Sequence, residues 1–233
     1  MNKQTLKEFL ISRCISCDDN QINQLEELMR QTLETNKLFN LTAITDPSIF
    51  MEKMILDSAI GLFDQDLTNL KVIDVGTGAG FPGLVLYILN PEMKLSLLDA
   101  TKKKIDYLQN YSKEHQYHIN FINERAEEYA RGHREEFDVA YARALAPLNV
   151  LIETIVPLLK VNGKLIALKG PGAFEEIEKS GKAFKKLNCH LQKIYEETLP
   201  ESDEKRSVIV IVKDEISSEQ YPRNYKDIKS RPL

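Results

Sequence analysis

The sequence predicts an α/β protein with a mostly parallel, doubly wound sheet, an N-terminal helical extension and a C-terminal antiparallel hairpin. Three observations support this fold class. Short apolar runs alternate with stretches of helical length from about Leu70 onward. A glycine-rich loop follows the first run, as in doubly wound sheets that bind ligands at strand ends. Two strand-like runs near the end of the chain have no helix between them.

Length and composition predict one well-buried fold and exclude several classes of protein. The chain has 233 residues, of which 42% are hydrophobic, so it is neither disordered nor collagen-like. Its formal net charge is -4, so a nucleic-acid partner would need a local basic patch. No signal peptide is recognisable, and no run approaches the roughly 18 apolar residues of a membrane span. We expect a cytoplasmic monomer without membrane contact.

The first third of the chain is predicted to be helical. Over residues 5–39, apolar side chains recur at helical spacing, which indicates one or two amphipathic helices. Pro47 follows an aspartate and is typical of a first helical turn, which predicts another helix through Leu56. We assign residues 1–66 to a helical extension that packs on a core domain of residues 67–233.

The rest of the chain supplies the sheet. Five apolar runs with intervening helical stretches predict parallel strands with helices on both faces, and two further runs predict the closing hairpin. In chain order the runs are "KVIDVG", "KLSLLDA", "HINFI", "FDVAYARA", "GKLIALKG", "HLQKIYEETLP" and "RSVIVIVKD".

The loop after the first strand, Val72–Val75, contains four glycines. The lack of Cβ atoms at Gly76, Gly78 and Gly80 lets backbone N–H groups approach a ligand and permits positive φ. A structural turn with tight helix packing would explain one or two of these glycines. Four of them at one strand end, with an acid at the end of the next strand, favour a nucleotide-like ligand.

The spacing of the glycines distinguishes between two candidate nucleotide-like ligands. The dinucleotide fingerprint G-x-G-x-x-G, started at Gly76, places its third glycine on Phe81. Started at Gly78 it fits, but it then begins inside the loop. A nicotinamide cofactor is therefore the weaker candidate. The alternation of Asp74, Gly76, Gly78 and Gly80 resembles the loop of Rossmann-like S-adenosylmethionine-dependent methyltransferases.

Residues after the second and third strands suit the same cofactor. Asp99 ends the second strand, where a carboxylate can accept both hydrogens of a ribose diol. The alternative for Asp99 is a helix N-cap, and we favour the ribose role. Ala126 and Glu127 follow the third strand, where this class of enzyme brackets the adenine ring. By itself, Glu127 would be a solvated acid in a first helical turn.

The three cysteines indicate reducing surroundings and no metal site. Cys14 and Cys17 form a C-x-x-C, but no βαβ pattern follows them and no second pair supplies further zinc ligands. Free, half-buried thiols in a helical segment are the preferred interpretation.

A series of seven motifs points to a narrower group. In chain order they are "FNLTAI", "ILDS", "DVGTGAGFPG", "LLDA", "RAEE", "ARALAPL" and "ALKG". Together they resemble the bacterial 16S ribosomal RNA guanine-N7 methyltransferase family, also called glucose-inhibited division protein B. The resemblance runs from about Phe39 to the last predicted strand.

This resemblance implies S-adenosylmethionine as cofactor and 16S rRNA, or the small ribosomal subunit, as partner. Guanine N7 has a lone pair and no proton, so the reaction needs alignment and no general base, and we assign no catalytic residue. Met54 stands where the family usually carries a histidine. With the loop motif, the resemblance implies cofactor contacts at Asp74, Gly76, Gly78, Phe81, Asp99, Ala100, Thr101, Ala126, Glu127 and Arg143.

The fourth and fifth strands end in two candidate RNA contacts. Arg143 is expected to hold the cofactor's carboxylate or an RNA phosphate, with an ordinary surface arginine or a salt bridge as the alternative. Lys169 is expected to contact RNA phosphates, with a snorkelling surface lysine as an equal alternative. The Asn/Asp-Pro-Pro-aromatic motif of amine methyltransferases is missing after Arg143, which disfavours methylation of an exocyclic amine.

The tail "YPRNYKDIKSRPL" is basic and offers Tyr221 and Tyr225 for stacking on RNA. A disordered, solvated end is the preferred interpretation. Two other functions remain open for the whole chain: a nicotinamide-cofactor oxidoreductase, and a non-catalytic ribosome-assembly module that binds RNA.

Overall fold

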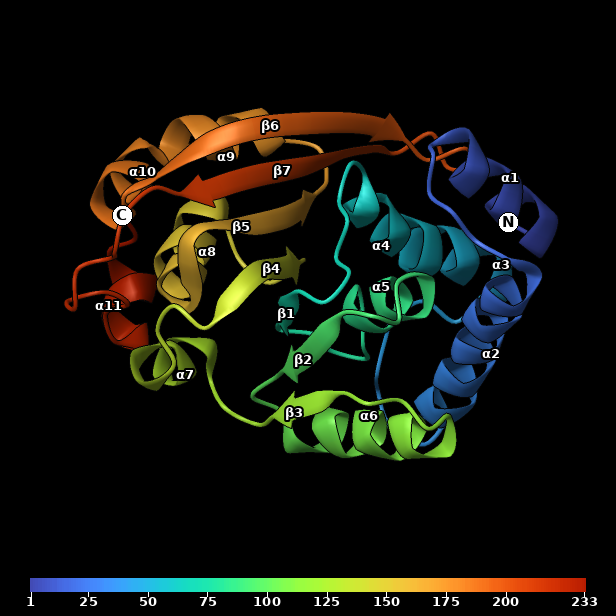
Figure 1. Cartoon of the computed structure of the whole chain (residues 1–233). Coiled ribbons are helices and arrows are strands. Elements are labelled where there is room, and N and C mark those ends of the chain that lie inside the picture. The colour runs from blue at the N-terminus through green and yellow to red at the C-terminus, as the bar shows by residue number, and fades with distance from the viewer.

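The computed structural model describes residues 1–233 and contains one sheet of seven strands in the order β3-β2-β1-β4-β5-β7-β6 (Figure 1). Neighbours among β1 to β5 pair in parallel, whereas β7 pairs antiparallel with both β5 and β6. The predicted fold class is therefore confirmed. The strands are β1 (Lys71–Val75), β2 (Lys94–Leu98), β3 (Asn120–Ile122), β4 (Phe137–Arg143), β5 (Leu159–Lys169), β6 (Cys189–Thr198) and β7 (Lys205–Lys213).

Helices cover both faces of the sheet, and each face has its own buried core. On one face lie α1 (Lys3–Ser12), α2 (Asp19–Asn36), α3 (Pro47–Phe50), α4 (Asp57–Ala59), α5 (Gly83–Leu89) and α6 (Lys102–Glu114). On the other lie α7 (Ala126–Gly132), α8 (Leu148–Ile155), α9 (Ala173–Lys179), α10 (Gly181–Leu187) and α11 (Tyr225–Ser230). Figure 1 shows α1 and α2 at the opposite side of the molecule from α11.

The first strand explains why the apolar runs are nearly continuous. Val72 belongs to the core under α1 to α6, whereas Ile73 and Val75 belong to the core under α7 to α11. Side chains of a strand alternate between faces, so a parallel strand covered on both sides needs apolar residues at almost every position. Asp74 is the exception, and its side chain lies under the glycine-rich loop.

The helical extension forms as predicted, with one difference. Asp18 and Gln21 make a reciprocal capping box at the start of α2, and Asp46 caps α3 with Pro47 in its first turn. The helix predicted from Pro47 through Leu56 is not one regular α-helix. A π-helical segment, η1 (Met51–Leu56), follows α3, and the helical stretch ends with α4 and a 3-10 turn, η2 (Ile60–Leu62). A second 3-10 turn, η3 (Val156–Leu158), follows α8 later in the chain.

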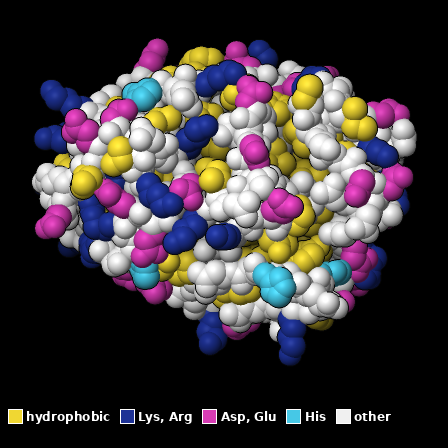
Figure 2. Space-filling view, in the orientation of Figure 1, with side chains coloured by type: hydrophobic (Ala, Val, Ile, Leu, Met, Phe, Trp, Pro, Cys, Tyr) yellow, Lys and Arg dark blue, Asp and Glu magenta, His cyan; other side chains and the backbone are white.

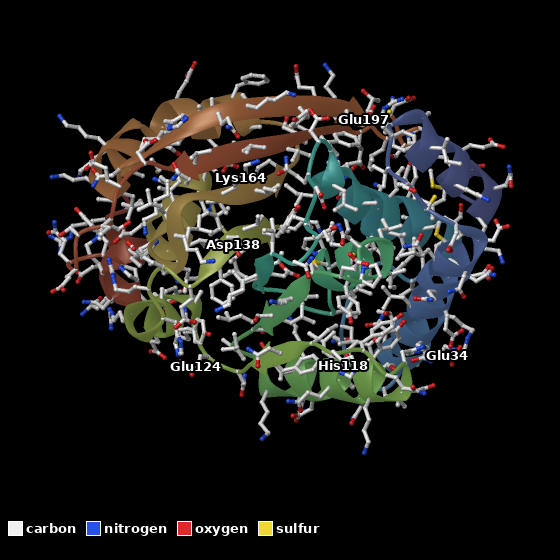
Figure 3. All side chains as sticks on the ribbon, viewed as in Figure 1. Glu34, His118, Glu124, Asp138, Lys164 and Glu197 are labelled. Atoms are coloured by element: carbon white, nitrogen blue, oxygen red, sulfur yellow. The ribbon has the colours of Figure 1, made fainter.

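The extension is tied to the hairpin and shares the core of the sheet. Leu6 and Phe50 are buried in the same cluster as Val72. Arg13, after α1, donates to Glu197 of β6 with Nη2 3.1 Å from Oε1. Figure 3 shows Glu197 at the end of β6 beside α1. The division into residues 1–66 and 67–233 stays a prediction about folding units, because both parts contribute to one core.

The amino-terminal ends of the central strands are closed by polar contacts. Asp138 accepts the backbone N–H of Lys71 at 2.8 Å and the Lys160 ammonium at 2.5 Å. Lys164 donates to Gln65 of the extension at 3.3 Å. Figure 3 shows Asp138 and Lys164 on the neighbouring strands β4 and β5. A ligand site is therefore expected at the opposite, carboxyl ends of the strands.

The tail is folded, so the preferred interpretation of a disordered end is wrong. Tyr221 is buried and is not free to stack on RNA. The Arg223 guanidinium makes two 2.6 Å bonds to Glu153, a fully buried carboxylate on α8. A buried carboxylate needs such a partner, because an unpaired charge in the interior is costly. Asn224 then caps α11 through the N–H of Asp227, at 2.9 Å.

The surface and the cysteines add three observations. Positive and negative side chains are interspersed over the face in Figure 2. No helix is both long and apolar enough to span a bilayer. Cys14 and Cys17 lie in the connection between α1 and α2, not inside a helix as expected, and all three cysteines are free. No group of three or more His, Cys, Asp or Glu side chains is arranged to hold a metal ion.

Candidate active site

The four glycines after β1 divide into two pairs with different neighbours. A Cβ at Gly80 would lie 2.6 Å from the Leu84 side chain, and one at Gly83 would lie 2.4 Å from Leu97. These two glycines allow α5 to pack tightly on the sheet. Gly76, Gly78 and Gly80 have positive φ, of 75°, 60° and 97°. A Cβ at Gly78 would meet nothing closer than 4.0 Å, so its surface is open.

Asp74 supports the loop from beneath. Its carboxylate accepts the backbone N–H of Gly83 at 2.8 Å and is buried. Burial raises the pKa of Asp74 to about 6, which the Gly83 N–H partly offsets. The loop is therefore fixed from the protein side at its far end.

Asp99 lies at the end of β2, next to β1. Its Oδ2 accepts the N–H of Gly78 at 3.0 Å, and its Oδ1 accepts the N–H of Thr101 at 2.8 Å. The N-cap of α6 is Thr101, so the alternative of an N-cap role for Asp99 is wrong. Each carboxylate oxygen accepts one bond from the chain, which leaves further lone pairs for a ligand.

A cavity of about 780 Å³, which we name the first cavity, lies over this strand end. Gly76, Asp99 and Ala100 form one side of it, and Ala126 and Glu127 form another. Five of the predicted cofactor contacts therefore border the same space. Tyr225, which the sequence offered for stacking on RNA, also lines this cavity. The further lining residues were not predicted as cofactor contacts: Leu98, Glu124, Arg125, Leu145, Ala146, Pro147, Leu148, Asn149, Val150, Leu151, Thr154, Glu176, Lys179, Ile228, Lys229 and Pro232.

The tail supplies a wall of the first cavity. The Arg125 guanidinium lies over the ring of Tyr225, 3.8 Å from its centroid, and also pairs with Glu127. Glu127 is buried by this arrangement and is not the solvated acid of the alternative interpretation. The signal for this wall was present in the tail as a tyrosine three residues before Ile228, a helical spacing that allows one face to pack inward.

Five predicted cofactor contacts do not line the first cavity. Asp74 is buried beneath the loop, and the N–H groups of Gly78 and Thr101 are bound to Asp99. Phe81 is buried against Phe50 with an edge-on contact of 5.5 Å between ring centroids. The fifth residue, Arg143, borders a different cavity.

This second cavity, of about 490 Å³, adjoins the first. Three loop residues, Leu145, Ala146 and Pro147, line both cavities, and so does Glu176. Charged side chains from five separate parts of the chain surround the second cavity: Asp57, Arg143, Lys169, Glu176 and Arg206.

Arg143 is bound to the extension. Its Nη1 donates to the carbonyl of Lys53 at 2.9 Å and to Asp57 at 3.2 Å, and its Nη2 lies 3.1 Å from the sulfur of Met54. Arg206 donates to the other oxygen of Asp57 at 2.9 Å. Burial raises the pKa of Asp57, and the two arginines oppose that rise. The alternative interpretation of Arg143, a salt bridge, describes this geometry, and the ion pair with Asp57 is largely buried.

Lys169 points inward. Its ammonium donates to the carbonyl of Ala146 at 2.6 Å and pairs with Glu176 at 2.8 Å, and its side chain is only 9% exposed. The alternative of a snorkelling surface lysine is therefore wrong. The ammonium has three hydrogens, so one is left beside these two partners for an RNA phosphate.

The wall between the two cavities is formed by the loop after β4. Ala144 has a positive φ of 50°, which is unfavourable for a residue with a Cβ. The next side chain, Leu145, lies on the bare backbone of Gly76, where a Cβ would come within 2.6 Å of it. The Leu145 side chain is thus part of the boundary between the first cavity and the second.

The chain matches the family model described as GidB, rRNA small subunit methyltransferase G, over residues 21–209. A ribosomal RNA small subunit methyltransferase G from Carboxydothermus hydrogenoformans is 40% identical, and the match covers 98% of each chain. One from Alkaliphilus metalliredigens is also 40% identical, over 100% of this chain and 99% of the relative.

Solved structures support the fold at lower identity. The structure of a ribosomal protein L11 methylase from Lactobacillus delbrueckii subsp. bulgaricus has a TM-score of 0.54 at 17% identity, with 70% of this chain and 79% of that chain covered. At this identity the likeness concerns the fold alone. The family follows from the sequence matches, which extend over nearly the full length: the chain belongs to the rRNA small subunit methyltransferase G (GidB) family.

Proposed function

We propose that this protein transfers a methyl group from S-adenosylmethionine to N7 of a guanine in 16S ribosomal RNA. The observation that carries the proposal is the convergence of Gly76, Asp99, Ala126 and Glu127 on one cavity at the carboxyl ends of β1, β2 and β3. A ribosomal substrate also supports the expectation of a cytoplasmic protein. A monomer stays part of the proposal.

The residues of the first cavity fit this cofactor. Asp99 has carboxylate lone pairs for the two ribose hydroxyls, and the N–H groups of Gly78 and Thr101 fix its orientation. Ala126 and Glu127 would border the adenine ring, and the backbone of Gly76 and Ala100 would lie along the nucleoside. A cavity of about 780 Å³ is within the range of small-molecule sites.

Several predicted contacts would act on the cofactor indirectly. Asp74 and Phe81 lie behind the loop, and we propose that they hold its backbone in place. For Arg143, the predicted direct contact with the cofactor's carboxylate or an RNA phosphate would use guanidinium N–H groups that its bonds to Lys53 and Asp57 leave over. Lys169 stays a candidate RNA contact through the third hydrogen of its ammonium.

Arg206 offers a matched control for Arg143, because both arginines pair with Asp57. A direct cofactor contact predicts that Arg143→Ala weakens S-adenosylmethionine binding about 10-fold, as expected for one lost charged hydrogen bond. Arg206→Ala would leave that affinity within a factor of two. Equal affinities of the two variants, measured by calorimetry, would exclude the direct contact.

The chemistry requires positioning and no base. The lone pair of guanine N7 forms the new bond to the methyl carbon, the carbon–sulfur bond breaks with its electrons going to sulfur, and no proton leaves. Positive charge moves from the sulfonium to the purine. The chain's own contribution would be to align the methyl donor and the guanine where the two cavities adjoin, at Leu145, and to exclude water.

The test has a binding arm and a transfer arm. Calorimetry with S-adenosylmethionine and with NADH separates the proposal from the oxidoreductase alternative. Mass spectrometry for N7-methylguanosine, after incubation with deproteinised 16S rRNA and with small subunits, tests the transfer. Donor binding without any methylated guanine would favour the assembly-module alternative.

A further inference from the structure

We propose that the second cavity receives the target guanine base, and that Glu176 recognises the edge of that base opposite N7. This inference rests on the proposed function, because it names the acceptor site of the same reaction. None of the family-level matches assigns a role to the second cavity or to Glu176.

The position of the second cavity is the first reason. A methyl transfer needs donor and acceptor in contact, so the acceptor site must adjoin the donor site. The second cavity shares Glu176 and the loop residues Leu145, Ala146 and Pro147 with the first, so the two cavities adjoin at these residues. Its volume of about 490 Å³ is ample for a base extruded from its stack, the usual way in which enzymes reach a base.

The chemistry of guanine is the second reason. When N7 faces the donor, the opposite edge of the base presents N1–H and the 2-amino group, which are both hydrogen-bond donors. A carboxylate is the side chain that accepts two such hydrogens. Adenine presents an acceptor at N1, which a carboxylate would repel. A carboxylate at this edge would therefore select guanine.

Glu176 has a carboxylate oxygen to offer. Both of its contacts within the chain use Oε2, which accepts the N–H of Leu148 at 2.7 Å and pairs with Lys169 at 2.8 Å. Oε1 accepts no bond from the chain, so its two lone pairs are left for the two N–H groups of the base, and the side chain is about one-third exposed. In Asp57, by contrast, each oxygen is held by an arginine. Of the two acids of this cavity, Glu176 is the available acceptor.

Lys169 would act as a positioning residue. Its ammonium joins the carbonyl of Ala146, in the wall loop, to the carboxylate of Glu176. The acceptor group is thereby tied to the same loop that separates the cavities. A negative carboxylate beside the base would also stabilise the positive charge that methylation creates on it.

The test uses inosine, which lacks only the 2-amino group of guanosine. After the methylated guanine has been mapped, a ligated RNA carrying inosine at that position is compared with the guanosine RNA in wild type, Glu176→Ala and Glu176→Gln. The matched control is Glu175→Gln, because Glu175 is the preceding residue of α9, is largely exposed and pairs only with Lys179. Each ratio compares two RNAs with one protein, so effects on donor affinity cancel.

We expect wild type and Glu175→Gln to prefer guanosine over inosine by about 10- to 100-fold in kcat/KM, as for a lost hydrogen bond to a charged group. In both Glu176 variants the preference should fall below about threefold. If a variant turns over too slowly, the same ratio is taken from RNA Kd values with S-adenosylhomocysteine. A preference retained in both variants, or missing in wild type, overturns the inference. Wild type that methylates no rRNA overturns the proposed function instead.

Discussion

The two cavities of the site are built in different ways. One side of the first cavity is formed by residues at the ends of β1, β2 and β3, with Asp99 as its ordered carboxylate, and the other side by the β4 loop, α8 and the tail. The charged side chains of the second come from the extension, β4, β5, α9 and β7. The residues proposed to bind the cofactor directly, Gly76, Asp99 and Ala126, belong to short local motifs, whereas the charged groups of the proposed acceptor site are brought together only by the folding of the whole chain.

The helical extension contributes a residue to the second cavity. Asp57 belongs to the extension and pairs with Arg143 of β4 and Arg206 of β7. Removal of one member of a buried ion group leaves the others uncompensated. The second cavity should therefore depend on the extension, and the first should not.

The largest expected effect is on stability. Asp57→Ala leaves the buried Arg143 without a carboxylate partner and Arg206 with Glu204 alone, and should lower the free energy of unfolding by about 3 to 5 kcal/mol. Urea unfolding measures this loss. The control is Asp64→Ala, which removes an exposed carboxylate paired with Lys193 and should cost far less. Similar losses for the two variants would remove the proposed dependence of the second cavity on the extension.

The next effect separates the cavities by ligand. Asp99→Ala removes the proposed ribose contacts and should weaken S-adenosylmethionine binding about 30- to 100-fold, with little change in RNA affinity. Calorimetry measures the first and filter binding the second. Asp106→Ala, on the exposed side of α6, is the control and should leave both affinities unchanged. A donor affinity that survives loss of Asp99 would contradict the assignment of the first cavity.

A smaller effect is expected at the wall supplied by the tail. Tyr225→Ala removes the ring under Arg125 and should weaken donor binding about 5- to 10-fold, the scale of one cation–π contact. Tyr195→Ala is the matched control, because that tyrosine also lies under a cation, Lys193, but on β6 and away from both cavities. If Tyr225→Ala changes RNA binding and spares the donor, the tail belongs to the acceptor side.

The smallest effect is a pH dependence. The pKa of Asp74 is raised to about 6 in the folded protein, so the folded state holds this proton more tightly than the unfolded state does. Stability due to Asp74 is therefore present at low pH and is lost as pH rises through 6. Relative to Asp74→Asn, wild type should gain about 1 kcal/mol of unfolding free energy between pH 7 and pH 5. Parallel pH profiles of the two proteins in urea would contradict this.

Much of the fold was predictable, because parallel strands covered on both faces leave continuous apolar runs. The interruption of the helix after Pro47 by η1 was not, since a π-helical segment has no signature in apolar spacing. The folded tail was missed for a similar reason. Its main anchor is Glu153, an acid in the apolar helix α8 that only the tertiary structure brings to Arg223.

The site was predictable where the position of a residue directly after a strand indicates its function. Gly76, Asp99 and Ala126 border the first cavity as their positions after strands suggested. For Gly80 and Gly83, the sequence pattern did not show whether the missing Cβ makes room for the packing of α5 or for a ligand. Glu176 could not be recognised at all, because the partners that fix its carboxylate are Lys169 and the backbone of Leu148, 28 residues before it.

The backbone at Ala144 has a consequence for motion. An L-residue held at a φ of 50° pays a conformational cost that it recovers when it relaxes toward a common region. A change in this dihedral would swing Leu145 away from Gly76. The loop between the donor and acceptor cavities thus contains a strained residue, and moving this loop costs less free energy than displacing an unstrained loop of the same length.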